Sequence, residues 1–442
     1  MELIHSFVSA HNVLISAGLL ILAYIFIATE KIPKVTIALL GAGITIFLGL
    51  VSQTRVLDGV LNPTYFVQYI DFNVIFLLVS MMIIVNITTR SGVFSYLANE
   101  LLKMTKGHPV LILIALGIFT AVVSAFLDNV TTVILIMPIT FAIARKLEID
   151  PIPYLLTEVF ASNIGGTATL IGDPPNIIIG SAAGFSFMDF VNNLTLVVAV
   201  ILIAVLAVMV LFFRKKLATT AEKMKEAANI DNTHTITDVP LMVRSMIVLA
   251  LVILGFVTHD ITHIETCVAA MLGASFLLLF EKPTDILRDV EWNTIFFFIG
   301  LFVMVYGLEV TGILSYLGHE FIEMTNGSIN KLIYLILWSS AILSSIIDNI
   351  PFVATMIPML KSMEPSLGGR EAMMPVWWAL SLGACFGGNG TLIGASANVV
   401  VAGLAMREGH PINFMKFLLW SIPVMLLSVL IASAALYLEY IM

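Results

Sequence analysis

Long apolar stretches recur along the chain from about residue 13 to residue 438, separated by short polar connections. Most of them approach the ~20 residues that a helix needs to cross a bilayer. They are continuous and rich in Leu, Ile and Val, without the alternation that is typical of barrel strands. Because a bilayer requires internally satisfied backbone groups, these runs predict membrane-spanning helices. The predicted spans lie at about 12–29, 35–52, 73–89, 153–181, 187–213, 245–259, 264–280, 293–309, 373–405 and 414–438.

Two further apolar regions, about 109–146 and 332–364, are each interrupted in the middle by an Asp-Asn pair. The interrupting residues are Asp128 with Asn129, and Asp348 with Asn349. We interpret each region as a re-entrant helical hairpin with the pair at its tip. The alternative is a fully spanning pair of helices, with each aspartate capping a helix at a wet surface. Both alternatives return the chain to the same side of the membrane, so charge counting does not distinguish them.

The composition supports a multi-pass membrane protein. The chain is 59% hydrophobic and 11% charged, whereas a soluble chain is about 45–50% apolar and roughly 25% charged. The N-terminus lacks the basic region of a cleavable signal, and its first apolar run is long enough to span. Two cysteines, Cys267 and Cys385, are too few for a disulfide framework or a thiolate metal site.

Lysine and arginine predict the orientation, since cytoplasmic loops are enriched in both. Placing the polar segment 214–243 in the cytoplasm leaves four of the 21 basic residues outside: Arg55, Lys331, Lys361 and Arg370. Both termini then lie outside an inner or plasma membrane. We interpret 214–243 as a solvated cytoplasmic linker between an N-terminal half, 1–213, and a C-terminal half, 244–442.

The two halves contain matching sequence blocks. Residues 71–97 align with 291–317 at a shift of 220 (291 minus 71), and 165–176 align with 387–398 at a shift of 222 (387 minus 165). The charge distribution makes matched spans run in opposite directions, which predicts two inverted-topology repeats. Inverted repeats with interrupted helices are typical of secondary transporters, whose substrate site lies near the midplane between the repeats.

Polar and glycine-rich interruptions supply the candidate ligands. Irregular backbone inside a membrane must line protein or a water-filled cavity, although small residues for close helix packing are the alternative interpretation. Burying a charged carboxylate near the bilayer midplane costs at least ~2.5 kcal/mol, which favours its protonated form. Asp128 and Asp348 are therefore also predicted to carry protons. The predicted substrate- or ion-binding residues are Asp128, Asn129, Thr131, Asn163, Gly165, Gly166, Thr167, Thr169, Asp173, Asn176, Asp348, Asn349, Gly387, Gly388, Asn389, Thr391, Ser396 and Asn398.

These motifs resemble a known family. Leu-Asp-Asn-Val-Thr-Thr at 127–132 and Asn-Ile-Gly-Gly-Thr-Ala-Thr-Leu-Ile-Gly-Asp-Pro-Pro-Asn at 163–176 resemble the ArsB/NhaD permeases of the ion transporter superfamily. That group includes arsenite and antimonite pumps, sodium/proton antiporters and the P protein, whose branch has the most similar Asp-Pro-Pro-Asn form. The resemblance implies a homodimer, a scaffold and a transport domain in each protomer, and an elevator mechanism.

Three functions are compatible with this pattern. The first is proton-coupled efflux of arsenite or antimonite, and the alternative is sodium/proton antiport by the same residues. A remote alternative is an intramembrane aspartyl protease. No lysine or arginine occupies a span centre, so we expect no cation to compensate a multiply charged anion.

The expected partners follow from the same reasoning. They are a small inorganic substrate or cation and the bilayer, with no nucleic acid, no cofactor and no resident metal. The expected coupling ion is the proton, with sodium as the alternative, and a soluble ATPase partner stays open. Cys385 is predicted to be a small packing residue, not an arsenic ligand.

Overall fold

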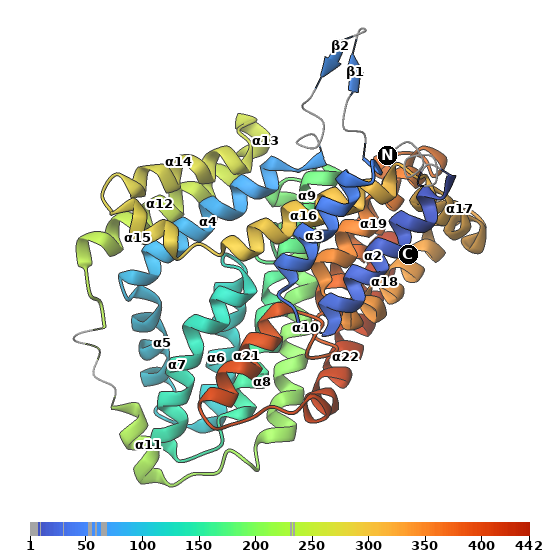
Figure 1. The fold of residues 1–442 in the computed structure, drawn as a ribbon. Helices are drawn as coiled ribbons and strands as arrows, with labels where there is room; N and C mark the ends of the chain where they lie inside the picture. Colours follow the sequence, from blue (N-terminus) through green and yellow to red (C-terminus); the bar gives the residue numbers. More distant parts are fainter. Residues whose placement is uncertain are drawn as a thin grey trace.

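A computed structural model of the chain describes residues 8, 10–29, 31–51, 55–57, 60–62, 69–229, 232 and 235–442. Its secondary structure is helical apart from one short antiparallel pair, β1 (Arg55–Leu57) and β2 (Val60–Asn62). Figure 1 shows β1 and β2 projecting from the helical body. In the described part of the chain, eight helices are long and apolar enough to cross a membrane. The all-helical membrane class predicted from the apolar pattern is therefore confirmed.

The first half of the chain supplies nine of the described helices and a helix in the linker. They are α2 (Asn12–Thr29), α3 (Lys34–Phe47), α4 (Phe72–Arg90), α5 (Val93–Met104), α6 (Pro109–Ser124), α7 (Asn129–Leu147), α8 (Ile152–Gly166), α9 (Pro174–Ala183), α10 (Phe187–Phe213) and, in the linker, α11 (Ala221–Ala228).

The second half repeats much of this order, with extra short helices in its connections. Its elements are α12 (Val239–Val257), α13 (His259–Thr262), α14 (Thr266–Leu278), α15 (Pro283–Arg288), α16 (Trp292–Glu309), α17 (Ile313–Thr325), α18 (Ile329–Ile346), α19 (Asn349–Met363), η2 (Glu364–Ser366), α20 (Arg370–Gly387), α21 (Ser396–Arg407) and α22 (Phe414–Tyr440).

The predicted spans contain helices, but not all of them are long. The segments predicted at 35–52 and 264–280 are α3 and α14, with 14 and 13 residues. These two fall short of the ~20 residues of a full crossing. The predicted broken spans are the pairs α8–α9 and α20–α21, each interrupted at its glycine-rich stretch. Figure 1 shows the two helices of each hairpin, α6 with α7 and α18 with α19.

Local sequence explains the corresponding turns in both halves. Gly92 and Gly312 occupy the same place, between α4 and α5 and between α16 and α17. Both have positive φ values, 82° and 77°, a conformation that glycine adopts without steric cost. The matched block of sequence therefore encodes the same sharp turn twice.

The two halves are interlocked through their helices. Helix α3 packs on α16 of the other half, and α14 packs on α4 in the corresponding way. Likewise α7 packs on α21, and α19 packs on α9, whereas α6–α8 and α18–α20 pair within a half. The sequence halves are thus not two separate bodies, since each supplies helices to the packing of the other.

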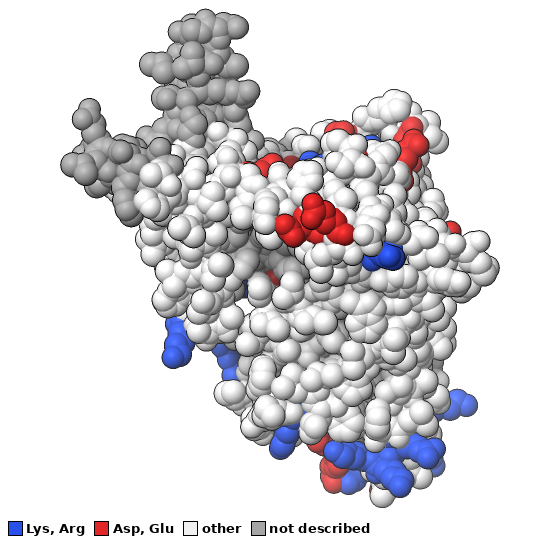
Figure 2. Space-filling model, turned by 90° about the vertical axis from the view of Figure 1, so that its right-hand side faces the viewer, with Lys and Arg blue, Asp and Glu red and all other residues white. Residues whose placement is uncertain are grey.

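The surface is divided by charge. Figure 2 shows a broad uncharged band, with lysine and arginine gathered at the lower end of the molecule. The linker lies at that end. It packs against other helices, whereas the sequence predicted a solvated segment. Helix α11 packs on α7 and α5, and Thr237 donates its N–H to the carbonyl of Ser91 (3.0 Å). Residues 230, 231, 233 and 234 of the linker, and the predicted N-terminal end 1–7, lie outside the described residues.

Candidate functional site

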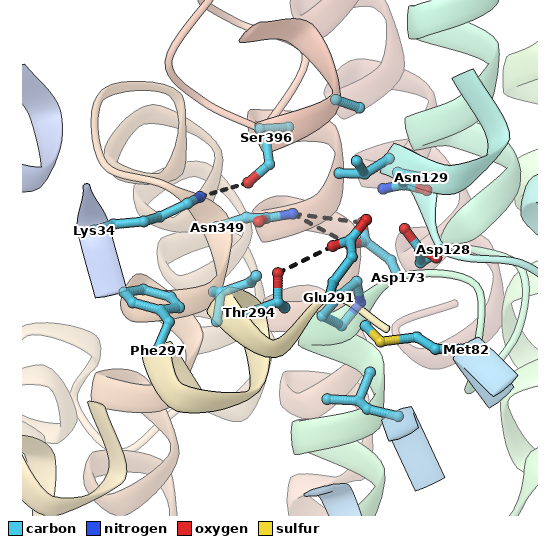
Figure 3. A pocket seen from close by; sticks show the side chains of 16 residues that line it. Lys34, Met82, Asp128, Asn129, Asp173, Glu291, Thr294, Phe297, Asn349 and Ser396 are labelled. Carbon is cyan, nitrogen blue, oxygen red and sulfur yellow. Dashed lines mark hydrogen bonds between the residues drawn. The ribbon is translucent and has the colours of Figure 1, made fainter. Parts of the chain in front are cut away.

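A pocket lies where the two hairpin tips meet the two interrupted helices. Its cavity has a volume of about 60 Å³, the space of roughly two water molecules. Figure 3 shows Lys34 on one side and Asp128 on the other, with Asn349, Asp173 and Glu291 between them. The wall is completed by apolar side chains, among them Leu78, Met82, Val130, Pro174, Phe297, Ile350, Ala395 and Ala397.

Both hairpin aspartates cap the helix that follows them. The Asp128 Oδ1 atom accepts the N–H of Thr131 at 2.9 Å, and Asp348 Oδ1 accepts the N–H of Ile350 at 3.2 Å. The capping alternative from the sequence therefore accounts for one oxygen of each carboxylate. The second oxygen of each side chain distinguishes the two tips.

The second oxygen of Asp348 forms an ion pair. Lys34 Nζ donates to Asp348 Oδ2 at 2.7 Å and to Ser396 Oγ at 2.6 Å, and Ser396 Oγ donates to the same Asp348 oxygen at 3.1 Å. The Asp348 side chain is 5% exposed and that of Lys34 is 39% exposed. Lys34 also lies 5.5 Å from the ring centre of Phe297, within the range of a cation–π interaction.

This pair corrects an expectation from the sequence. We predicted no compensating cation because no basic residue occupies the centre of an apolar run. Lys34 is the first residue of α3 and follows a polar turn, so the pattern assigned it to a cytoplasmic loop. Asp348 lies 314 residues away in the chain, and the contact arises only when the halves interlock.

Two further carboxylates line the pocket, and Glu291 was not predicted. Asn349 Nδ2 lies 3.4 Å and 3.5 Å from the two carboxylate oxygens of Asp173. Glu291 accepts a hydrogen bond from Thr294 Oγ1 at 3.1 Å and interacts electrostatically with Asp128. Its position at the start of an aligned block was the available signal, since the matching residue at the shift of 220 is also acidic, Asp71.

The asparagines of the interrupted helices hold the interruptions together. Asn176 Nδ2 donates to the carbonyls of Thr167 (3.1 Å) and Thr169 (2.9 Å). Asn398 Nδ2 donates in the same way to Gly388 (2.8 Å) and Thr391 (2.8 Å). Buried carbonyls freed by a broken helix need such partners, so these amides have a structural role in the present geometry.

The threonines attach each interruption to its own hairpin. Thr169 Oγ1 donates to the carbonyl of Ala125, and Thr391 Oγ1 donates to the carbonyl of Ser345 at 2.6 Å. Each acceptor lies at the end of the first hairpin arm or just after it, α6 in one half and α18 in the other. The tip and the interruption of each half are thereby fixed relative to one another.

The glycines allow the same close packing in each half. A Cβ atom at Gly165 would collide with the backbone of Ala121, and one at Gly387 would lie 2.6 Å from the carbonyl oxygen of Ala341. The two alanines that these Cβ atoms would meet, Ala121 and Ala341, are themselves related by the shift of 220. Close helix packing, the alternative interpretation of these glycines, therefore applies to both.

A family model described as citrate transporter matches residues 24–383 of this chain. The chain belongs to the citrate transporter family. An uncharacterised transporter of Mycobacterium tuberculosis is 42% identical over 428 residues, which cover 96% of this chain and 98% of the relative. The P protein of Homo sapiens is 32% identical, over 94% of this chain and 59% of its own length.

A solved structure has a similar fold. The YdaH transporter of Alcanivorax borkumensis, described as having an unusual topology, superposes with a TM-score of 0.56. The similarity covers 97% of this chain and 98% of that one, at 15% sequence identity. With its family and its apolar helices, the protein is a multi-pass membrane transporter and not an enzyme.

In this member of the citrate transporter family, the predicted residues separate into two groups. Asp128, Asn129, Asp173, Asn349 and Ser396 line the pocket, and Asp348 adjoins it through Lys34 and Ser396. The others do not line the pocket: Thr131, Asn163, Gly165, Gly166, Thr167, Thr169, Asn176, Gly387, Gly388, Asn389, Thr391 and Asn398.

Amide and thiol groups that do not line the pocket bond to one another. Asn163 Nδ2 donates to Asn389 Oδ1 (2.8 Å) and to Asn398 Oδ1 (3.0 Å). The Cys385 thiol is buried 3.7 Å from Asn176 Oδ1 and does not line the pocket of this family member. Within the described residues, no three carboxylate, thiol or imidazole groups converge to hold a metal ion.

Proposed function

We propose that the protein is a proton-coupled secondary transporter that exchanges protons for a small cation, with sodium as the first candidate. The observation that carries the proposal is the charge of the site. Asp128, Asp173 and Glu291 line the pocket and Asp348 adjoins it, whereas Lys34, paired with Asp348, is the one basic side chain among the described lining residues. Four carboxylates and one cation leave an acidic excess, which is stabilised either by protons or by a bound cation.

Oxygen-rich surroundings also suit a small cation. The amides of Asn129 and Asn349 and the hydroxyl of Ser396 line the pocket beside the carboxylates. Carboxylate, amide and hydroxyl oxygens are the ligands that hard cations prefer. Because fewer than three carboxylates of the described residues converge on any one point, the site suits a singly charged ion better than a tightly held divalent metal.

The name of the family suggests citrate, and the charge of the pocket opposes it. A tricarboxylate would approach several carboxylates of the site. Its one ammonium partner among the described lining residues is Lys34, which is already paired with Asp348. Like charges 4 Å apart in a partly buried site repel by ~4 kcal/mol at an intermediate dielectric. The cavity volume of about 60 Å³ also favours a small substrate.

Efflux of arsenite or antimonite is the second candidate. Arsenous acid is uncharged at neutral pH, so the acidic excess does not exclude it, and Asn129, Asn349 and Ser396 offer hydrogen bonds to its hydroxyl groups. Cys385 is not among the described residues that line the pocket, and its thiol interacts with the lining carboxylate of Asp173. The resemblance to ArsB/NhaD permeases supports both candidates equally.

We further propose an elevator arrangement of two inverted repeats. The reciprocal packing of α3 on α16 and of α14 on α4 supports a scaffold built from both halves, and the hairpins with the interrupted helices would form the transport domain. In this arrangement both hairpins are re-entrant. The basic end in Figure 2 would face the cytoplasm, by the positive-inside rule. A homodimer in the plasma membrane, driven by ion gradients, completes the proposal.

Transport assays in proteoliposomes test the proposal. Vesicles loaded with a pH-sensitive dye receive sodium, potassium, arsenite or citrate outside, and the internal pH is followed. We expect sodium to drive protons across the membrane while citrate gives no response above protein-free vesicles. Arsenite-dependent proton movement without a sodium response would replace the first candidate by the second. A response to citrate alone would contradict both.

A further inference from the structure

Lys34 occupies a boundary between two cavities. Together with Ser396 it lines the carboxylate pocket and also a neighbouring cavity of about 300 Å³, which Asp348 lines as well. This neighbouring cavity, which we call the antechamber, is otherwise walled by apolar side chains such as Ile27, Val399 and Val400. Any ion passing between the antechamber and the pocket meets the bonded group formed by Lys34, Asp348 and Ser396.

In the bonded group, the amine of Lys34 takes a place between Asp348 and Ser396 that a small cation could occupy. The Lys34 ammonium donates to a carboxylate oxygen of Asp348 at 2.7 Å and to the hydroxyl oxygen of Ser396 at 2.6 Å, and it lies over the Phe297 ring. These are the kinds of contact that a small cation would make with Asp348 and Ser396. The ammonium is therefore a competitor for the same oxygens, tethered to helix α3.

The tether joins two groups of helices. Lys34 comes from α3, which packs on α16, whereas Asp348 and Ser396 belong to the second hairpin and to α21. A second contact strengthens the same junction: Tyr24 of α2 donates its hydroxyl to the carbonyl of Pro351 (2.8 Å), and this hydroxyl also contacts Thr355 Oγ1 (2.5 Å). The Lys34 bond differs from this second contact because an incoming cation can replace it.

We infer that Lys34 is an intrinsic cation that occupies the Asp348 part of the site until the transported cation displaces it. Displacement transfers Asp348 from the ammonium to the substrate and opens the boundary between antechamber and pocket. It also releases α19 and α21 from α3. Occupation of the site and release of the second hairpin are then the same event, which would prevent the hairpin from moving without a cation or a proton on Asp348.

This inference rests on the proposed cation exchange, and it specifies the effect of removing the charge. In Lys34→Gln the competitor is lost, so the half-saturating sodium concentration falls by about tenfold, the size expected for a charge-assisted hydrogen bond. The maximal rate of exchange falls as well, because coupling between binding and release is lost. Lys34→Arg keeps the charge and retains a half-saturating concentration near that of the wild type.

Chemical restoration separates charge from folding. Lys34→Cys is purified, reconstituted and treated with 2-aminoethyl methanethiosulfonate, which adds an ammonium on a chain close to the length of lysine. The negatively charged 2-sulfonatoethyl reagent provides the comparison. Lys31→Cys, three residues earlier on an exposed position outside both cavities, is the matched control. The native Cys267 and Cys385 are buried, and treated wild type measures any reaction with them.

The expected result is a raised half-saturating concentration and a recovered maximal rate only in aminoethylated Lys34→Cys. Unchanged sodium dependence in Lys34→Gln and Lys34→Cys, with the wild type active, would overturn the inference and leave the proposed function intact. An inactive wild type would overturn the proposed function itself. Lower melting temperatures in every Lys34 variant, with no recovery on aminoethylation, would assign the residue a structural role and also overturn the inference.

Discussion

The two hairpin tips have the same shape and different charge environments. Asp128 and Asp348 each cap the second arm of a hairpin through one carboxylate oxygen. Only Asp348 has an ammonium partner, Lys34, and a hydroxyl partner, Ser396. The residue that matches Ser396 at the shift of 222 is Pro174, which has no hydroxyl to offer.

Asp128 instead faces another acid. Glu291 interacts with it electrostatically, and none of the ion pairs formed by the described residues includes Asp128. The two tips therefore share the same helix cap, while their charged surroundings differ. In the proposed mechanism, Asp128 is the aspartate open to a cation or proton, and Asp348 is the aspartate controlled by Lys34.

The largest expected effect separates the two aspartates. Asp128→Asn removes the unpaired carboxylate and should lower sodium/proton exchange by about 100-fold, the effect of losing a charged ligand worth roughly 3 kcal/mol. Asp348→Asn leaves Lys34 without its partner, so the ammonium opposes an incoming cation. Its half-saturating sodium concentration should rise by about tenfold, with a smaller loss of maximal rate.

Proteoliposome assays over a range of sodium concentrations measure both parameters. Glu226→Gln, an exposed carboxylate of the linker helix α11, is the matched control and should behave as wild type. Equal effects of the two aspartate substitutions on rate and on half-saturation would remove the functional distinction between the tips.

A double substitution tests whether Lys34 is the source of the difference. If the unpaired ammonium causes the weak sodium binding of Asp348→Asn, then adding Lys34→Gln should restore part of the affinity. Residues in direct contact typically couple by about 0.5–3 kcal/mol, and the 2.7 Å contact places this pair in that class. The comparison needs all four proteins at equal reconstitution. Strictly additive changes in half-saturation would show that the two side chains act independently.

The next prediction concerns the close packing of a glycine against a hairpin arm, which the two halves share. Gly165→Ala and Gly387→Ala each force a methyl group against the neighbouring hairpin arm, which should destabilise the fold by about 1–3 kcal/mol. Gly403→Ala on α21 meets nothing within 4 Å and should be neutral or slightly stabilising, by up to ~1 kcal/mol. Thermal unfolding followed by tryptophan fluorescence measures the three. A loss confined to one of the two buried glycines would contradict the structural equivalence of the halves.

The smallest effect is expected at an ion pair outside the pocket. Arg90 donates to the carboxylate of Asp289 at 2.6 Å, with both side chains partly exposed. This bond lowers the pKa of Asp289, so the pair stabilises the fold at neutral pH, and the contribution is lost as pH falls through the lowered pKa. Arg90→Gln should cost roughly 0–1 kcal/mol and leave sodium half-saturation unchanged.

Melting temperatures at neutral and acidic pH measure the Arg90 contribution, which should shrink at acidic pH. The same preparation serves as a charge control for Lys34, since both substitutions remove one cation. A change in sodium affinity in Arg90→Gln as large as that in Lys34→Gln would mean that net charge, and not the boundary position, explains the Lys34 effect.

Much of this fold could be predicted from apolar length and repetition. Helices were expected wherever an apolar run approached the length of a span, and the Asp-Asn pairs marked the points where α6 turns into α7 and α18 into α19. Glycine and proline marked the interruptions before α9 and α21. Each of these features depends on neighbours within a few residues, so it is readable in one stretch of sequence.

The residues that set the charge of the site could not be found in the same way. Lys34 follows a polar turn and reaches Asp348 only through packing between distant parts of the chain. Glu291 stands at the polar start of a span, where an acid is ordinary. Conversely, Asn176 and Asn398 are of a residue type that often binds ligands, but their side-chain amides donate to the carbonyls of the interruptions. Residue type indicated the presence of a polar site, while tertiary contacts decide which groups face it.

Proton release on cation binding tests the central claim most directly. Purified protein in weakly buffered detergent solution, with a pH indicator, is titrated with sodium chloride and, as the control for ionic strength, with choline chloride. The account predicts saturable, sodium-specific release of protons from the wild type and from Glu226→Gln, and loss of that release in Asp128→Asn. Absence of release from the wild type, or undiminished release from Asp128→Asn, would contradict exchange of proton and cation at this aspartate.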